Sequence, residues 1–301
     1  MYTVIGASGN IGSVISKSLL EKGEKIRAVG RHAGKLQPFA QRGAEPFVAD
    51  VTDSDALSVA LSGARAAFLM IPPNITAYDY RADQELISDA IAAAVKKSGL
   101  QYAVSLSSYG AHAPSGTGPI TGLHNFEKKL NAIDKLNVLH LRPAYFFENH
   151  LAGIGMIQMM GMFGGAIKSD LKIPQIATRD IGTYAADRLL KLDFNGKQAQ
   201  ELLGERDLSM NEVTTAISKA LNSSELRYVQ FPYDQVEKIL AQLGAPPKSA
   251  ASMIEMFQGI NNGIVVPQEP RRAANSTPTS IETFIKDVFI PAFHQSKAVG
   301  A

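Results

Sequence analysis

Residues 1–12 read Met1-Tyr-Thr-Val-Ile-Gly-Ala-Ser-Gly-Asn-Ile-Gly12, with glycines at positions 6, 9 and 12 directly after a short apolar run. Apolar residues then recur at helical spacing as far as Gly23, and a second apolar run covers residues 25–29. A strand, a glycine-rich turn, a helix and a second strand form the unit that cradles a dinucleotide pyrophosphate. The alternative is an ordinary strand-to-helix turn, because a glycine triplet alone is a weak signal.

The three glycines have different roles in the dinucleotide interpretation. Gly6 lets the chain turn off the strand, Gly9 lets the backbone approach the pyrophosphate, and Gly12 lets the helix pack closely on the sheet. The helix N-terminus adds free amide donors and a partial positive charge. The predicted pyrophosphate site therefore comprises Gly6, Ala7, Ser8, Gly9, Asn10, Ile11 and Gly12.

The residues after the second strand indicate which dinucleotide is bound. An NAD site usually carries an acidic residue about 20 positions after the glycines, whereas an NADP site carries arginine for the 2′-phosphate. This chain has Arg31 and Lys35 there and no carboxylate between residues 25 and 41. The pattern predicts NADP(H) in preference to NAD(H). The alternative is that both cations only solvate the start of a helix.

Composition excludes several classes of function. The 301 residues include 30 basic and 28 acidic side chains, and the net charge of +2 gives no footprint for nucleic acid or an anionic membrane. There is no cysteine, and the six histidines are scattered, so no metal site is predicted. The sequence contains no membrane-length apolar run, and we expect a soluble, cytoplasmic protein without a signal peptide.

Strand-like and helix-like segments alternate through the first half of the chain. Strands are expected at 2–5, 25–29, 45–48, 66–71, 101–106 and 137–142, and helices near 10–22, 32–41, 53–62, 77–98 and 122–135. This order predicts an α/β fold, a doubly wound parallel Rossmann sheet with a smaller mixed α/β C-terminal lobe. We expect the NADP-binding domain to comprise residues 1–150 and 177–225, and the substrate or lid lobe 151–176 and 226–301. Helix caps are expected at Asp53, Thr76, Asp180 and Ser209.

Ligands of such a sheet bind where the strands end, so the residues after each strand are candidates. Asp50 and Val51 follow the third strand and could flank adenine, although Asp50 could equally cap a loop. Met70, Ile71 and Pro72 follow the fourth strand, where they form either an apolar wall against ribose and nicotinamide or a rigid turn.

The usual proton donor of short-chain dehydrogenases is missing. These enzymes normally place Tyr-x-x-x-Lys on one helix face, and none of the nine tyrosines here has lysine four residues later. His124 and Lys128 have that spacing instead, with a solvated helix face as the alternative. Lys128 could reach ribose hydroxyls, and His124 could donate a proton near neutral pH. Ser107, after the fifth strand, adds a hydroxyl that could orient a carbonyl or a ring edge.

Regular alternation ends after Asn149. Residues 153–165 mix glycines with methionines, which line adaptable apolar pockets, and buried helix packing is the alternative. We expect an apolar pocket formed by Tyr109, Tyr145, Phe146 and residues 156–162.

The motifs together resemble those of the NmrA-like atypical short-chain dehydrogenases. They are Gly6-Ala-Ser-Gly-Asn-Ile-Gly12, Gly30-Arg31, Ala49-Asp50-Val51, His124-x-x-x-Lys128, Leu141-Arg-Pro143, Phe146-Phe-Glu-Asn149 and Thr178-Arg-Asp-Ile-Gly182. The resemblance implies an NADPH-preferring Rossmann domain with a small lobe that encloses a cleft. It also implies that Lys128 holds the nicotinamide ribose and that the amide side of nicotinamide meets Phe146, Phe147, Glu148 and Asn149.

The family includes reductases of quinones, azo dyes and triphenylmethane dyes, and also NADP sensors that regulate a partner protein. We expect hydride transfer to a flat conjugated acceptor such as a quinone, because such an acceptor tolerates a missing acid. The candidate catalytic residues are Lys128, His124 and Tyr145, the last of which follows Ala144 where the family motif has glycine. The alternative is a non-catalytic NADP(H) sensor. The expected partner is an apolar or aromatic small molecule, and a homodimer or a regulatory protein partner stays open.

Overall fold

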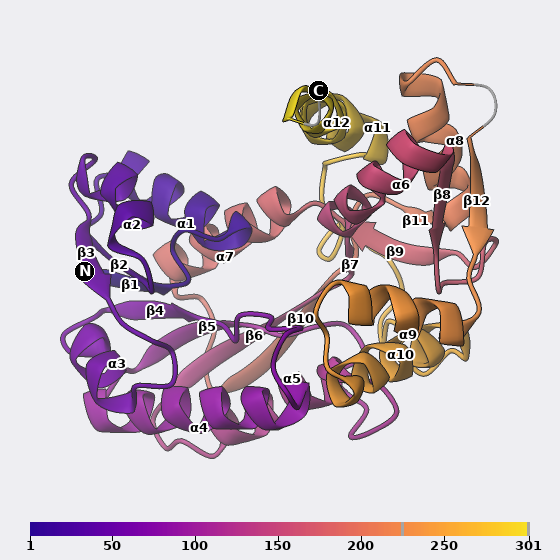
Figure 1. Ribbon diagram of the computed structural model, residues 1–301. Helices are drawn as coiled ribbons and strands as arrows, with labels where there is room; N and C mark the ends of the chain where they lie inside the picture. Colours follow the sequence, from indigo (N-terminus) through magenta and orange to yellow (C-terminus); the bar gives the residue numbers. More distant parts are fainter. Residues whose placement is uncertain (224–225, 300–301) are drawn as a thin grey trace.

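The computed structural model describes residues 1–223 and 226–299. Its central sheet has seven strands in the order β10-β6-β5-β4-β1-β2-β3, and every neighbouring pair is parallel (Figure 1). The strands are β1 (Tyr2–Ile5), β2 (Ile26–Gly30), β3 (Glu45–Val48), β4 (Ala66–Leu69), β5 (Tyr102–Leu106), β6 (Asn137–Pro143) and β10 (Lys197–Leu202). The chain order reverses between β1 and β4, which is the switch point where such sheets bind ligands.

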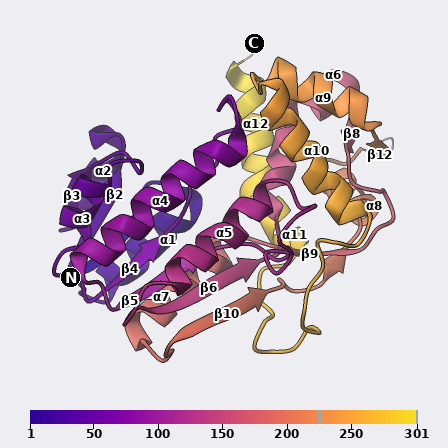
Figure 2. The ribbon, with the colours of Figure 1, turned by 90° about the horizontal axis from the view of Figure 1, so that it is seen from below.

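Helices cover both faces of the sheet because successive strand residues point to opposite sides. One face packs on α1 (Asn10–Glu21), α2 (Ala33–Ala40) and α7 (Thr178–Lys191). The other packs on α3 (Ser54–Leu61), α4 (Tyr80–Ser98) and α5 (Pro119–Asn131), and Figure 2 shows α4 and α5 crossing this face. Tyr2 and Val4 enter the first core and Ile5 the second. The predicted doubly wound parallel sheet is confirmed.

The smaller lobe is built on short strands and helices from the second half of the chain. Its strands are β7 (Tyr145–Phe146), β8 (Met162–Gly165), β9 (Ile173–Ile176), β11 (Asp207–Leu208) and β12 (Arg227–Gln230). Its helical segments are η1 (Phe147–Gly153), α6 (Ile154–Met160), α8 (Met210–Ala220), α9 (Tyr233–Gln242), α10 (Pro247–Asn261), α11 (Ile281–Phe284), η2 (Ile285–Phe289) and α12 (Ile290–Val299).

The boundary between the two lobes remains a prediction. Val213 and Ile217 of α8 share a buried cluster with Phe284 and Phe289, so α8 packs with the smaller lobe. This packing favours a boundary before residue 207 rather than after 225. Residues 224–225 and 300–301, which fall within the predicted ranges, lie outside the described residues. Within the described ranges, no helix combines the length and apolar character needed to cross a membrane.

Two predicted helix caps are confirmed and two are wrong. Asp53 accepts hydrogen bonds from the backbone at the start of α3, and Ser209 forms a capping box with Glu212. Thr76 does not cap α4, because Asp79 accepts from the Ala82 backbone N–H at 3.1 Å.

Asp180 is not a cap because α7 begins at Thr178, two residues before Asp180. Its carboxylate instead accepts hydrogen bonds from the backbone N–H and the hydroxyl of Thr279, at 3.0 and 2.6 Å. A contact with a residue far along the chain thus takes the place of the local cap.

Candidate functional site

The predicted site residues gather at one edge of the sheet. Because the seven strands are parallel, their carboxyl ends meet along a single edge (Figure 1). The segments after these ends contain the glycine turn at 6–12, residues 31–35, 50–51, 70–72, Ser107 and residues 145–149. The fold therefore brings to one edge residues that lie as far apart in the sequence as Gly6 and Asn149.

The glycine turn has the geometry of a dinucleotide cradle. Gly6 has φ +74°, and its amide and that of Ala7 donate to the Val29 carbonyl at 3.0 and 3.1 Å. A Cβ on Gly12 would lie 2.1 Å from the Gly6 carbonyl oxygen, so α1 starts in contact with the turn. A Cβ on Gly9 would meet only that same oxygen, at 3.3 Å, so the turn is open on its outer side.

The start of α1 is left free to bind an anion. No described side chain caps α1, so its first-turn amides have no intrahelical or side-chain acceptor. Such amides bind phosphate, helped by the partial positive charge of the helix end. These residues fit a dinucleotide pyrophosphate.

Asp50 closes its own loop, which was the alternative considered for it. Its Oδ1 accepts from the Thr52 backbone N–H at 2.9 Å and from the Thr52 hydroxyl at 2.7 Å. These hydrogen bonds lower the pKa of Asp50, and the nearby charge of Arg31 lowers it further. Contact of Asp50 and Val51 with adenine stays a prediction.

Met70 lies directly on the glycine turn, since a Cβ on Gly6 would be 2.6 Å from its sulfur. Ile71 is buried in the core between the sheet and helices α3 to α5. Of the apolar residues that follow β4, Met70 therefore contacts the predicted cofactor turn, and the side chain of Ile71 supports the sheet.

A buried ion pair lies below the ends of β5 and β6. Glu127 of α5 is 4 % exposed, and it accepts from Arg142 Nε at 2.9 Å, from Arg142 Nη2 at 2.5 Å and from the Ser107 hydroxyl at 2.6 Å. Burial raises the pKa of Glu127, but the hydrogen bonds from Arg142 and Ser107 outweigh it and hold the pKa below its ordinary value. Because the Ser107 hydroxyl donates its hydrogen bond to this carboxylate, the Ser107 oxygen can only accept a hydrogen bond from another group.

Sequence reasoning missed Glu127 as a residue of this region. Glu127 lies four positions after Leu123 and three before Leu130. This spacing places its carboxylate on the apolar face of the helix. A charged residue at a core position needs a partner, and this signal could have pointed to Arg142.

His124 and Lys128 lie on the same helix but in different surroundings. His124 Nδ1 is 2.8 Å from the Ala111 carbonyl oxygen, so this nitrogen carries a hydrogen and donates it to that oxygen. Lys128 is exposed, and its ammonium has no ion pair or hydrogen bond within the described ranges. Nδ1 of His124 is thus already engaged as a donor, whereas the Lys128 ammonium is free to bind a ligand.

The residues after β6 point in different directions. Tyr145 packs beside the His150 ring, with centroids 5.6 Å apart, and burial raises the pKa of Tyr145 to about 12. Phe147 is buried in the smaller lobe, with its ring 5.4 Å from that of Phe284. Contact of Phe147 with nicotinamide stays a prediction, although its side chain is in that core.

Glu148 and Asn149 also differ in their surroundings. Glu148 accepts from the backbone N–H of Thr178 at 3.1 Å and from its hydroxyl at 2.5 Å, which caps α7. Asn149 is exposed.

The predicted apolar pocket is only partly assembled. Tyr109 is 3 % exposed, in a cluster bordered by Tyr145 and by Phe257 of α10, which sequence reasoning missed. Phe257 also borders the cluster that Met156 and Met162 join. The other two methionines of α6, Met159 and Met160, are 81 % and 65 % exposed and line neither cluster.

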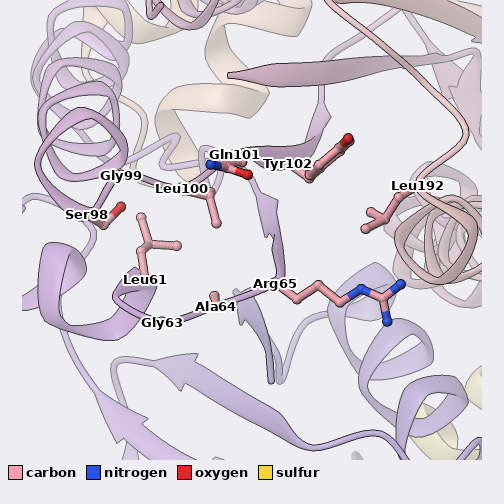
Figure 3. A pocket seen from close by; sticks show the side chains of 10 residues that line it. All are labelled: Leu61, Gly63, Ala64, Arg65, Ser98, Gly99, Leu100, Gln101, Tyr102 and Leu192. Carbon is pink, nitrogen blue, oxygen red and sulfur yellow. The ribbon is translucent and has the colours of Figure 1, made fainter. Parts of the chain in front are cut away.

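One cavity lies away from the site. It has a volume of about 470 Å³ and is found at the amino ends of β4 and β5, opposite the edge that carries the glycine turn (Figure 3). Its lining residues are Leu61, Gly63, Ala64, Arg65, Ser98, Gly99, Leu100, Gln101, Tyr102 and Leu192. None of the predicted site residues is among them.

Comparison with known proteins identifies similar chains over nearly the whole length. The model of the NmrA-like family matches residues 2–285. An NAD(P)H azoreductase of Xenophilus azovorans is 26% identical over 257 residues, covering 85% of this chain and 86% of that one. Quinone oxidoreductase 2 of Escherichia coli K12 is 26% identical over 267 residues, covering 87% and 89%. The crystal structure of the Escherichia coli NADPH-dependent quinone oxidoreductase QOR2 with NADPH superposes with a TM-score of 0.82 at 22% identity, covering 96% and 100%.

Proposed function

The chain belongs to the NmrA-like family, and from that premise we propose that it is an NADPH-dependent reductase that transfers hydride to a flat conjugated acceptor such as a quinone. Two relatives named as an azoreductase and a quinone oxidoreductase support this class of acceptor. The glycine turn and the uncapped start of α1 support the cofactor. Bound NADPH would supply the hydride, and the chain would bind the cofactor, orient its nicotinamide ring and shield that ring from water.

We assign the cofactor contacts to the residues at the edge of the sheet. The first-turn amides of α1 would hold the pyrophosphate, and Met70 would cover the central ribose. The free ammonium of Lys128 would hold the nicotinamide ribose. The cations that the sequence predicts for the 2′-phosphate of NADP(H), Arg31 and Lys35, are both exposed after β2 and support a preference for this cofactor. Positioning of the nicotinamide ring against the acceptor then supplies the rate through proximity.

The hydrogen bonds that the polar groups already make are the observation that favours a quinone-like acceptor. His124 donates to a backbone carbonyl, and Ser107 donates to Glu127. Tyr145, with a pKa of about 12, holds its proton firmly. A simple ketone needs a proton at its oxygen as hydride arrives, whereas a quinone spreads the charge into its ring. The site therefore favours the second class.

The direct test is oxidation of NADPH by a panel of quinones and an azo dye, with simple aliphatic ketones as controls. We expect turnover with quinones and none with the ketones, measured by loss of the reduced-nicotinamide absorbance. NADPH binding in calorimetry without turnover on any acceptor would contradict the reductase proposal and favour the NADP(H) sensor that acts through a protein partner.

Lys128→Ala is expected to raise the KM for NADPH about tenfold, because an ammonium bound to ribose hydroxyls contributes about 1.4 kcal/mol. Lys129→Ala is the matched control, since Lys129 pairs with Glu85 and Asp89 on α4. Steady-state kinetics should show the change only for Lys128. Equal KM values in both variants would mean that Lys128 only solvates the helix face.

A further inference from the structure

A second cavity of about 470 Å³ adjoins the glycine turn, between α1 and α2, which lie beside each other in Figure 1. We call it the α1–α2 hollow. It is lined by hydroxyl, cationic and apolar side chains, namely Ser8, Ser13, Lys17, Lys35, Pro38, Phe39 and Arg42. No carboxylate lines it, so its chemistry suits a phosphate group.

The hollow begins where the adenosine ribose of a dinucleotide would lie. Gly30 is the last residue of β2, and a Cβ built on it would be 3.8 Å from the Ser8 hydroxyl. The end of β2 is the position at which Rossmann proteins bind the adenosine ribose and its 2′ substituent. A group attached to that ribose and directed toward Ser8 would enter the hollow.

Two of the three cationic side chains that line the hollow have no carboxylate partner within the described ranges. Lys17 and Lys35 are exposed and make no ion pair within the described ranges, whereas Arg42 pairs with Glu21 at 3.1 Å. Helix side chains lean toward the N-terminus, so Lys17 leans along α1 toward the glycine turn. Arg31 does not line the hollow, and its charge acts on Asp50.

We propose that Lys17 of α1 is a specificity-determining residue, which with Lys35 holds the 2′-phosphate of NADP(H) in the α1–α2 hollow. The inference rests on the proposed cofactor, and it changes the assignment made from sequence, in which Arg31 and Lys35 bind that phosphate. Two ammonium groups without ion-pair partners provide a stronger field for an anion than one guanidinium beside a carboxylate.

The test measures binding of four probes by calorimetry: NADPH, NADH, adenosine 2′,5′-bisphosphate and adenosine 5′-monophosphate. Lys17→Gln is expected to raise the Kd of the two probes with a 2′-phosphate about tenfold, as for loss of one charge-assisted contact. The other two should change less than about twofold. Lys22→Gln, which removes the exposed lysine that caps the C-terminal end of α1, is the control and should change none of the four.

The outcomes separate this inference from the proposed function. A Lys17→Gln variant that binds all four probes like the wild type, or that loses affinity equally for NADPH and NADH, would overturn the role of Lys17. A large loss of NADPH affinity in Arg31→Gln with none in Lys17→Gln would return the 2′-phosphate to Arg31. The wild type could bind NADPH without reducing any acceptor while Lys17→Gln selectively loses affinity for the two probes with a 2′-phosphate. That combination would support the role of Lys17 in the hollow and refute the reductase proposal.

Discussion

Replacement of Gly12 by alanine is expected to raise the Kd for NADPH about a hundredfold, which corresponds to about 2.7 kcal/mol. A Cβ at this position would lie 2.1 Å from the Gly6 carbonyl oxygen and 2.8 Å from the Gly6 carbonyl carbon. Both atoms belong to the backbone and cannot move aside as a flexible side chain does. The start of α1 must then withdraw from the turn, and the amides that face the pyrophosphate lose their alignment.

Gly155→Ala is the control for this change. Gly155 lies in α6, in the smaller lobe, and a Cβ there would meet nothing within 4 Å. Calorimetric titration with NADPH should show an unchanged Kd for Gly155→Ala. If Gly12→Ala also binds NADPH like the wild type, then the cofactor does not depend on the contact between α1 and the glycine turn. Circular dichroism of both variants will show whether the sheet and helices are retained.

Glu127→Ala is expected to lower the free energy of unfolding by about 3–5 kcal/mol. Removal of this carboxylate leaves the Arg142 guanidinium, whose side chain is 17% exposed, without its partner between the sheet and α5. Ser107 loses its acceptor at the same time. Glu127→Gln keeps the shape and one acceptor oxygen, so it should lose less stability than Glu127→Ala.

The matched control is Glu85→Ala, which removes a carboxylate from the surface pair with Lys129. That pair has an N–O distance of 2.6 Å, but Glu85 is 46% exposed and Lys129 retains Asp89. Its loss should cost less than about 1 kcal/mol. Urea unfolding of the three variants measures the difference. Similar small losses for Glu127→Ala and Glu85→Ala would show that the buried pair does not stabilise the junction of α5 with the sheet.

Local patterns predicted the backbone well where neighbouring residues determine it. β1 and β3 occupy the predicted residues, and α1 spans 10–21 against the predicted 10–22, because apolar periodicity and helix caps act over a few residues. The errors at Thr76 and Asp180 arise from competition among nearby polar residues and from a distant contact. Asp79 lies nearer the true start of α4, and Asp180 binds Thr279, 99 residues along the chain.

The amino-acid sequence by itself determined the parallel sheet, its doubly wound helices and the edge that carries the glycine turn, because short-range spacing sets the order of strands and helices. Only the tertiary structure decided which side chains at that edge remain free. It placed Glu127 against Arg142 and Ser107, turned His124 to a carbonyl, and brought Lys17 and Lys35 to the same hollow. These contacts depend on how separate elements pack, and the spacing of residues along one segment carries no information about the neighbour it will meet.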